Sequence, residues 1–180
     1  MKGTVSPSMD EGLEDSIFLV LCTALAMMMR VYLFPIESGD YLQFLHPWYE
    51  TLKENGGLLA IGMDVGDYMP PYFYLLALLT YLPIRDIFAI KALSSLADIA
   101  LAVFAANLVD FERKSRVKWT AAYCTVLFLP SVFLNSGVWG QCDAIYVSAL
   151  LAFLYYAMRG SSGKAVLAYS ISFVFKLQAV

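Results

Sequence analysis

The stretch IFAIKALSSLADIALAVFAANL (residues 87–108) decides the fold class of this chain. It is long enough to cross the hydrocarbon core of a membrane as a helix, which takes about 20 apolar residues. Its polar residues Lys91, Ser94, Ser95 and Asp98 recur at helical spacing, so they share one helix face. Ionisable side chains at membrane depth face a protein interior or a wet cavity. The stretch therefore predicts a membrane helix packed among others.

The composition of the whole chain agrees with this prediction. Of its 180 residues, 60% are hydrophobic and 15% are charged, whereas soluble domains carry about 25% charged residues. The net charge of −3 is too small to indicate a nucleic-acid partner. Three cysteines without a CxxC pair indicate neither a disulfide framework nor a zinc site. The predicted fold class is all-α, a polytopic membrane helix bundle with a long extracytoplasmic loop and with membrane lipid as a partner.

Five membrane-spanning segments are predicted, at residues 16–35, 87–108, 119–135, 144–158 and 165–180. Ser16 is the expected N-cap of the first segment. The last segment is cut at Val180, so we expect this sequence to be the N-terminal part of a longer protein.

The loop at residues 36–86 is expected to lie outside the cell. The basic stretches DFERKSRVKW and RGSSGK favour the cytoplasm, which predicts a multi-pass protein of the cell membrane with a cytoplasmic N-terminus. Residues 70–83 are apolar but short, with a proline at each end, so an interfacial helix is favoured over a further span. A full span there would place the N-terminus outside. Two amphipathic helices are expected in the loop, and Gly56 and Gly57 are expected to end the first.

Several charged residues are predicted to gather in the outer half of the membrane. Arg30, Lys91 and Lys176 fall there with Asp40 and Asp143 at the rim. Cations beside carboxylates on several helices indicate a site for an anionic lipid headgroup next to an acid or a base.

Each of these residues also has a simpler explanation. Arg30 and Lys91 could extend to the membrane interface with their charged heads in water. Asp98 could pair with a neighbouring helix, and Asp40 could be the N-cap of the loop helix. His46 is expected to be a loop residue and not a metal ligand, because it is the only histidine.

The motifs ESGDY, GDYMPPYFYLL, KALSSLADIAL, SGVWGQCD and SISFVFKLQ, in this order, resemble the GT-C superfamily of glycosyltransferases that use polyprenyl-phosphate sugars. The chain looks most like bacterial relatives of the mannosyltransferase of GPI-anchor assembly. It is also similar to dolichyl-phosphate-glucose glucosyltransferases. The resemblance covers about residues 30–180 and depends on the order and spacing of the motifs.

This resemblance implies a role for each motif. The acidic motif with Glu37 implies that Asp40 is the catalytic base. The loop motif also includes Asp67 and a Pro-Pro pair, Pro70 and Pro71, that leads a membrane-associated helix. The remaining motifs imply binding of the donor phosphate or substrate by Gln141, Asp143, Lys176 and Gln178.

The implied reaction moves a mannose-type or glucose-type hexose from a polyprenyl-phosphate donor to a lipid-linked or cell-envelope glycan, with inversion at the anomeric carbon. A carboxylate suits the removal of a proton from the acceptor hydroxyl. Arg30, Lys91 or Lys176 suits the phosphate of the leaving group. No tightly bound cofactor and no metal site are expected, although Asp64 and Asp67 could hold a cation weakly.

Two other classes of function remain open from the sequence. In a transporter or lipid flippase, Lys91, Asp98 and Lys176 would form a translocation path, but no internal repeat is found. The chain could also be a non-catalytic membrane subunit. The resemblance favours the glycosyltransferase, in a bacterial plasma membrane.

Overall fold

The structure of the protein, a computed structural model, describes the backbone of residues 9–176 and the side chains of residues 13–176. This part of the chain is all-helical, with 78% helix and no strand. The α-helices, in chain order, are α1 (Met9–Leu33), α2 (His46–Glu54), α3 (Pro70–Leu79), α4 (Asp86–Val109), α5 (Arg116–Phe128), α6 (Pro130–Leu134), α7 (Asp143–Met158) and α8 (Ser162–Phe175). Two π-helical turns, η1 (Tyr41–Leu45) and η3 (Asn135–Trp139), and a 3₁₀ turn, η2 (Gly57–Ala60), complete it.

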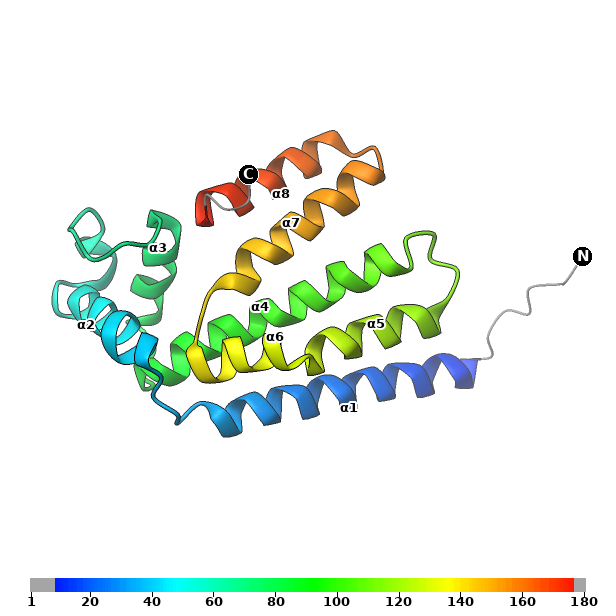
Figure 1. Cartoon of the computed structure of the whole chain (residues 1–180), viewed down its shortest axis with the longest axis horizontal. Helices are drawn as coiled ribbons and strands as arrows, with labels where there is room; N and C mark the ends of the chain where they lie inside the picture. Colours follow the sequence, from blue (N-terminus) through cyan, green and yellow to red (C-terminus); the bar gives the residue numbers. More distant parts are fainter. Residues whose placement is uncertain (1–8, 177–180) are drawn as a thin grey trace, which may run out of the picture.

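Helix α4 lies in the middle of the molecule, with α5 and α1 on one side and the α7–α8 pair on the other (Figure 1). At one end, which we call the loop end, residues 36–85 fold into a small subdomain around α2 and α3. At the opposite end, the basic end, lie the turns that join α4 to α5 and α7 to α8. These turns and the first turns after them carry Arg113, Lys114, Arg116, Lys118, Arg159 and Lys164.

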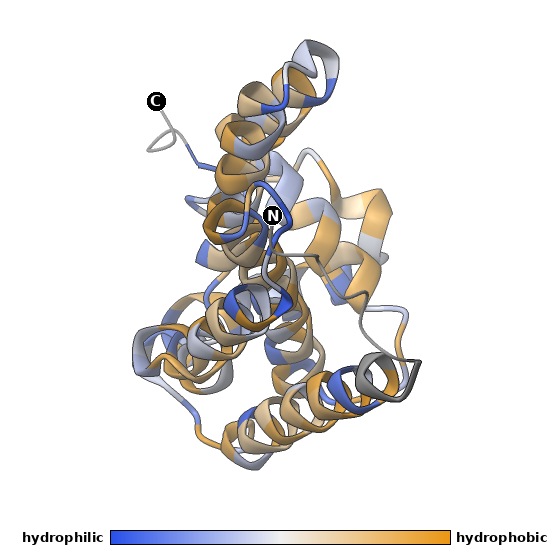
Figure 2. Cartoon of the chain, turned by 90° about the vertical axis from the view of Figure 1, so that its right-hand side faces the viewer, coloured by the Kyte–Doolittle hydropathy of each residue, from blue (hydrophilic) through white to orange (hydrophobic). Residues whose placement is uncertain are grey.

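Among the described residues, two helices are long and apolar enough to cross a membrane, Leu13–Leu33 and Asp86–Val109. Helix α5 and the segment Pro130–Trp139 would together form a third, bent by 47°. Proline lacks the N–H that would continue the helix, so Pro130 accounts for the break. Helices α7 and α8 are apolar but have 16 and 14 residues. These apolar helices are compatible with a membrane protein, and Figure 2 shows hydrophobic residues along much of their length.

The ends of two predicted helices can be compared directly with the structure. Helix α1 already begins at Met9, so the prediction that Ser16 is its N-cap is wrong. Ser16 instead accepts a hydrogen bond of 3.0 Å from Arg116. Helix α2 ends at Glu54, and Gly56 follows with a φ of 88°, which confirms that the glycine pair ends it.

The packing of α1, α4 and α5 depends on small residues. Ala26, Ala102 and Ala106 are fully buried where these helices meet, and small side chains allow helix backbones to approach closely. The other faces of α1 are open, since only 11% of its apolar window is buried, against 44% for α4. Helix α1 therefore presents an apolar surface that suits lipid.

Arg30 and Asp98 form a buried ion pair at the centre of this packing. Arg30 Nε lies 2.8 Å from Asp98 Oδ2, and both side chains are almost completely buried. Arg30 also donates to the carbonyls of Ala26 (2.9 Å) and Leu127 (3.0 Å), and Ser136 donates to Asp98 (2.6 Å). The pair thus joins α1, α4, α5 and η3. The expectation that the polar face of α4 looks into a protein interior is confirmed, as is the pairing of Asp98 with a neighbouring helix.

Removal of one partner of this pair is expected to destabilise the protein by about 3–5 kcal/mol, because it leaves an uncompensated buried charge. We expect this for Asp98→Leu, and for Arg30→Met in the same range. The double substitution should recover much of the loss, since it buries no charge. The free energy of unfolding in detergent micelles measures the effect. Additive losses in the double variant would show that the two side chains do not act as a pair.

Candidate functional site

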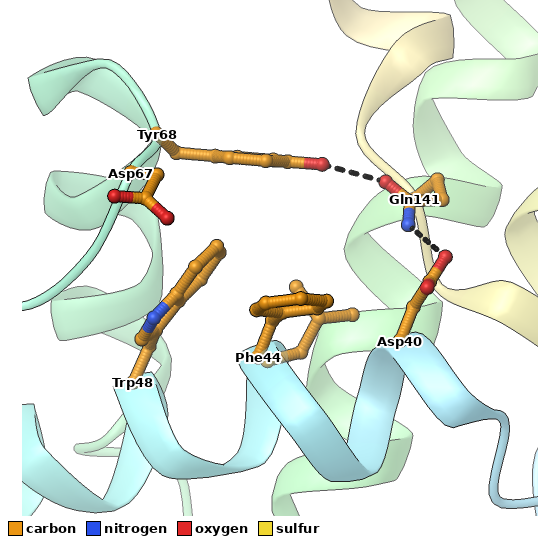
Figure 3. A pocket seen from close by; sticks show the side chains of 7 residues that line it. Asp40, Phe44, Trp48, Asp67, Tyr68 and Gln141 are labelled. Carbon is orange, nitrogen blue, oxygen red and sulfur yellow. Dashed lines mark hydrogen bonds between the residues drawn. The ribbon is translucent and has the colours of Figure 1, made fainter.

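A cavity of about 270 Å³ opens at the loop end, between the segment after α1, the segment before α3 and the turn before α7. Seven residues line it, namely Asp40, Phe44, Leu45, Trp48, Asp67, Tyr68 and Gln141 (Figure 3). Of the predicted site residues, the structure brings Asp40, Asp67 and Gln141 together here.

Asp40 directly precedes the π-helical turn η1, and its side chain lines this cavity. Asp40, Phe44 and Trp48 follow at intervals of four residues and present one face of η1 and α2. The alternative prediction that Asp40 is the N-cap of the loop helix is wrong, because its side chain makes no capping bond. Ser38 takes that place, with its Oγ accepting from the backbone N–H of Tyr41 at 3.2 Å. The carboxylate of Asp40 is therefore directed to the cavity.

Two hydrogen bonds in series orient Asp40. Tyr68 donates its hydroxyl proton to Gln141 Oε1 at 2.7 Å, and Gln141 Nε2 donates to Asp40 Oδ2 at 2.7 Å (Figure 3). Burial raises the pKa of Tyr68 well above its ordinary value, and the nearby Cys142, Asp143 and Asp40 raise it further. The phenol therefore stays protonated and keeps donating. Because Tyr68 occupies the amide oxygen, the amide NH₂ is the group turned toward Asp40.

The turn before α7 holds Gln141 in place. Gly140 has a φ of 69°, a left-handed conformation that favours glycine. Its carbonyl accepts a hydrogen bond of 3.0 Å from Ser94 on α4. A polar residue of the buried α4 face thus fixes the turn from which Gln141 reaches the cavity.

Three aromatic side chains, those of Phe44, Trp48 and Tyr68, form much of the rest of the cavity lining. The Trp48 ring centroid lies 5.7 Å from that of Phe44, 5.0 Å from that of Tyr68 and 5.5 Å from that of Phe73. The backbone of Gly66 closes the remaining side of the indole, because a Cβ there would fall 2.2 Å from Trp48 Nε1. The indole is therefore held from several sides.

Two of the predicted phosphate-binding cations lie elsewhere. The guanidinium of Arg30 is bonded to Asp98 and to backbone carbonyls. Lys91 is fully buried, and its Nζ donates to the carbonyls of Phe34 (3.0 Å) and Ile36 (2.5 Å), just after α1. Neither side chain extends to an interface, so the explanation that they do is wrong. Both bond to protein groups inside the bundle.

Lys176 and Asp143 form a half-buried ion pair, with Nζ to Oδ1 at 2.5 Å. Asp143 Oδ2 also accepts from Asn135 at 3.5 Å, and the ammonium lies 5.2 Å from the ring centroid of Tyr146. Asp143 lines a second cavity of about 250 Å³ that contains Asp98 and Asn135. Gln178, predicted to act beside Lys176, lies outside the described residues.

Of the residues of the loop motif other than Asp40, Asp67 lines the first cavity, whereas Glu37, Pro70 and Pro71 do not. Glu37 is exposed, with an oxygen 3.9 Å from an Arg85 nitrogen. Pro70 and Pro71 begin α3, as the Pro-Pro prediction implies for a helix start. Asp64 is exposed and lines a different cavity from Asp67.

Sequence reasoning missed the residues that shape this region most. Tyr68, Phe44 and Trp48 line the cavity but were not predicted as site residues. His46 begins α2 and lies 2.6 Å from Asp86, which also accepts a hydrogen bond of 2.7 Å from Tyr41. His46 and Asp86 are 40 residues apart in sequence, so only the folded loop reveals their contact.

No group of three or more His, Cys, Asp or Glu that could hold a metal ion occurs among the described residues. The cavity at Asp40 instead offers an oriented carboxylate next to an aromatic wall. Comparisons with known protein families, with curated proteins and with solved structures find no match to this chain. The chemistry of the site therefore carries the functional argument.

Asp86→Ala is expected to loosen the contact of η1 and α2 with α4, because it leaves Tyr41 and His46 without their shared acceptor. Amide hydrogen exchange in residues 41–54 should become about ten-fold faster, corresponding to roughly 1.4 kcal/mol. Glu50→Ala is the matched control, since it removes only the exposed pair with Lys53. Equal exchange in both variants would contradict a role of Asp86 in holding this segment.

Proposed function

We propose that the protein is a membrane glycosyltransferase of the GT-C type, with Asp40 as general base. The observation that carries the proposal is that Asp40, at the edge of an aromatic cavity, is oriented by Gln141 and Tyr68. A general base has to be held within hydrogen-bond reach of the proton that it removes. The resemblance of the motifs around Asp40 and Gln141 to that superfamily supports the same assignment.

In the proposed reaction Asp40 takes the proton of an acceptor hydroxyl. The acceptor oxygen forms a bond to the anomeric carbon of the sugar, while the bond from that carbon to the donor phosphate breaks. The electron pair leaves with the polyprenyl phosphate, and attack from the opposite side inverts the anomeric carbon. The acceptor is a lipid-linked or cell-envelope glycan, and the transferred sugar is a mannose-type or glucose-type hexose.

The donor phosphate is proposed to bind at Lys176. Arg30 and Lys91 are bonded to buried protein groups, so their use would require breaking those contacts. Lys176 is 29% exposed and its partner Asp143 follows Gln141 by two residues. An arriving phosphate could replace Asp143 as the partner of the ammonium and stabilise the leaving group.

The proposed orientation places the loop end outside a cell membrane and the basic end in the cytoplasm. Lysines and arginines concentrate at the turns of the basic end, and cytoplasmic loops favour such residues. Helices α1, α4, α5 with α6, α7 and α8 would then form a polytopic bundle, with α2 and α3 at the outer surface.

A transporter is the second candidate, favoured by the broken helix at Pro130 and by the cavity that Asp98, Asn135 and Asp143 line together with apolar residues. Broken helices beside polar cavities are typical of transporters. The two carboxylates of this cavity, however, are each paired with a cation, Asp98 with Arg30 and Asp143 with Lys176. Transfer of sugar in the assay below would favour the enzyme over the transporter.

Asp40→Asn is expected to lower transfer of radiolabelled sugar from polyprenyl-phosphate donors by at least about 10²-fold, because an amide cannot accept the proton. Membranes that carry the protein are assayed with both mannose and glucose donors. Asp64→Asn is the control, since Asp64 is exposed and lies outside the Asp40 cavity. Wild-type rates in Asp40→Asn would remove Asp40 as the base, and no transfer by the wild type would favour the transporter.

Tyr68→Phe is expected to reduce kcat about ten-fold with little change in the donor KM, because Gln141 loses the bond that orients it. If Tyr68 acts through Gln141, then Tyr68→Phe should have no further effect in a Gln141→Ala background. A full ten-fold loss in that background would show that the phenol contributes through packing or by direct contact with substrate.

A further inference from the structure

The charges around the Asp40 cavity argue against binding of a phosphate in it. Among the described residues that line it, the charged ones are Asp40 and Asp67, both carboxylates, and none is a cation. Phosphate sites use cations or clusters of backbone N–H groups. The part of a substrate that enters this cavity is therefore not a phosphate or another anion.

The side chains form a slot with one polar end. Figure 3 shows the rings of Tyr68 and Phe44 on opposite sides of the cavity, Trp48 at one end, and Gln141 with Asp40 at the other. Phe44 is 42% exposed, so its ring is accessible. A flat group that enters this slot meets aromatic surface on both faces and the general base at its far edge.

A pyranose ring matches this arrangement. Its faces carry C–H bonds that pack on aromatic rings, and its rim carries hydroxyls that both donate and accept hydrogen bonds. In the slot, the rim would meet the carboxylate of Asp67 near Trp48 and the carboxylate of Asp40 at the other end. Carboxylates accept hydrogen bonds from hydroxyls and would not suit an anionic sugar.

The backbone of Gly66 holds the indole of Trp48 in position before a substrate binds. A Cβ at residue 66 would lie 2.2 Å from Nε1 and 2.3 Å from Cε2 of Trp48. The backbone of residue 66 thus touches the indole and leaves no room for a larger residue. An immobilised aromatic surface lowers the ordering cost of binding.

We propose that this cavity is the binding subsite for an uncharged pyranose of the acceptor, packed between Tyr68 and Phe44 with one hydroxyl at Asp40. The inference rests on the proposed function, and it assigns the cavity to the acceptor because the donor sugar is attached to a phosphate. Gly66 and Phe44 determine its shape, and Asp67 contributes to its selectivity for neutral sugars.

Saturation-transfer NMR on the purified protein in detergent micelles tests this directly. The probes are methyl α-D-mannopyranoside and methyl α-D-glucopyranoside, with glucuronate and inorganic phosphate as competitors. We expect saturable binding of at least one glycoside and no displacement by either anion. Absence of binding to the wild type, or displacement by phosphate, would overturn the inference.

Substitutions locate the binding in the cavity. Gly66→Ala and Phe44→Ala should each weaken glycoside binding about ten-fold. Gly163→Ala is the matched control, because a Cβ there meets nothing within 4 Å. Because Phe44 is partly exposed, we expect Phe44→Ala to fold. This variant therefore tests the slot even if Gly66→Ala does not fold. Wild-type binding in Phe44→Ala would contradict the proposed slot.

The two proposals can fail separately. Glycoside binding that depends on Phe44, in a protein that transfers no sugar, would retain the subsite and remove the enzyme assignment. Transfer that depends on Asp40 with an unchanged acceptor KM in Phe44→Ala would retain the enzyme and overturn the subsite.

Discussion

The ion pair between Arg30 and Asp98 is the interaction on which the rest of the structure depends. It lies in an apolar interior where an unpaired charge would be very costly. Through Ala26, Leu127 and Ser136 its hydrogen bonds reach four segments of the chain. Because each partner requires the other, the register of α1 against α4 is fixed. This register also places the ends of α1 and η3. The segments that follow these two ends carry Asp40 and Gln141 of the candidate site.

Lys91 and Ser94 lie on α4 closer to the loop end and fix two further segments of the chain. Lys91 bonds to the carbonyls of Phe34 and Ile36, where the chain leaves α1. Ser94 bonds to the carbonyl of Gly140, where the chain enters α7. Asp40 follows the first contact within a few residues and Gln141 follows the second directly. The polar face of α4 therefore places both partners of the Asp40–Gln141 hydrogen bond, although none of its residues lines the cavity.

Much of the helical architecture could be predicted from sequence, because apolar length and helical spacing are local properties. The buried face at Lys91 to Asp98 and the helix end at Gly56 follow from such patterns. The partners of the charges could not be predicted, since Arg30 and Asp98 are far apart in the chain. Asp40 was found through its motif, but its orientation by Tyr68 depends on a loop fold that leaves no periodic pattern. Ser38, and not Asp40, caps η1. Both residues can cap a helix and they lie two positions apart, so the sequence alone does not distinguish them.

Among cations at membrane depth, some hold the protein together and others can bind a substrate. Burial alone indicates that such a residue has a partner, and Arg30 and Lys91 have protein partners. An enzyme that used these two cations for its substrate would have to break structural contacts in every catalytic cycle. Lys176 is partly exposed and paired with a single carboxylate, so exchange of its partner would cost far less. Accessibility and the number of existing partners therefore favour Lys176 as the cation for the proposed donor, while the aromatic slot with its two carboxylates suits the proposed acceptor sugar.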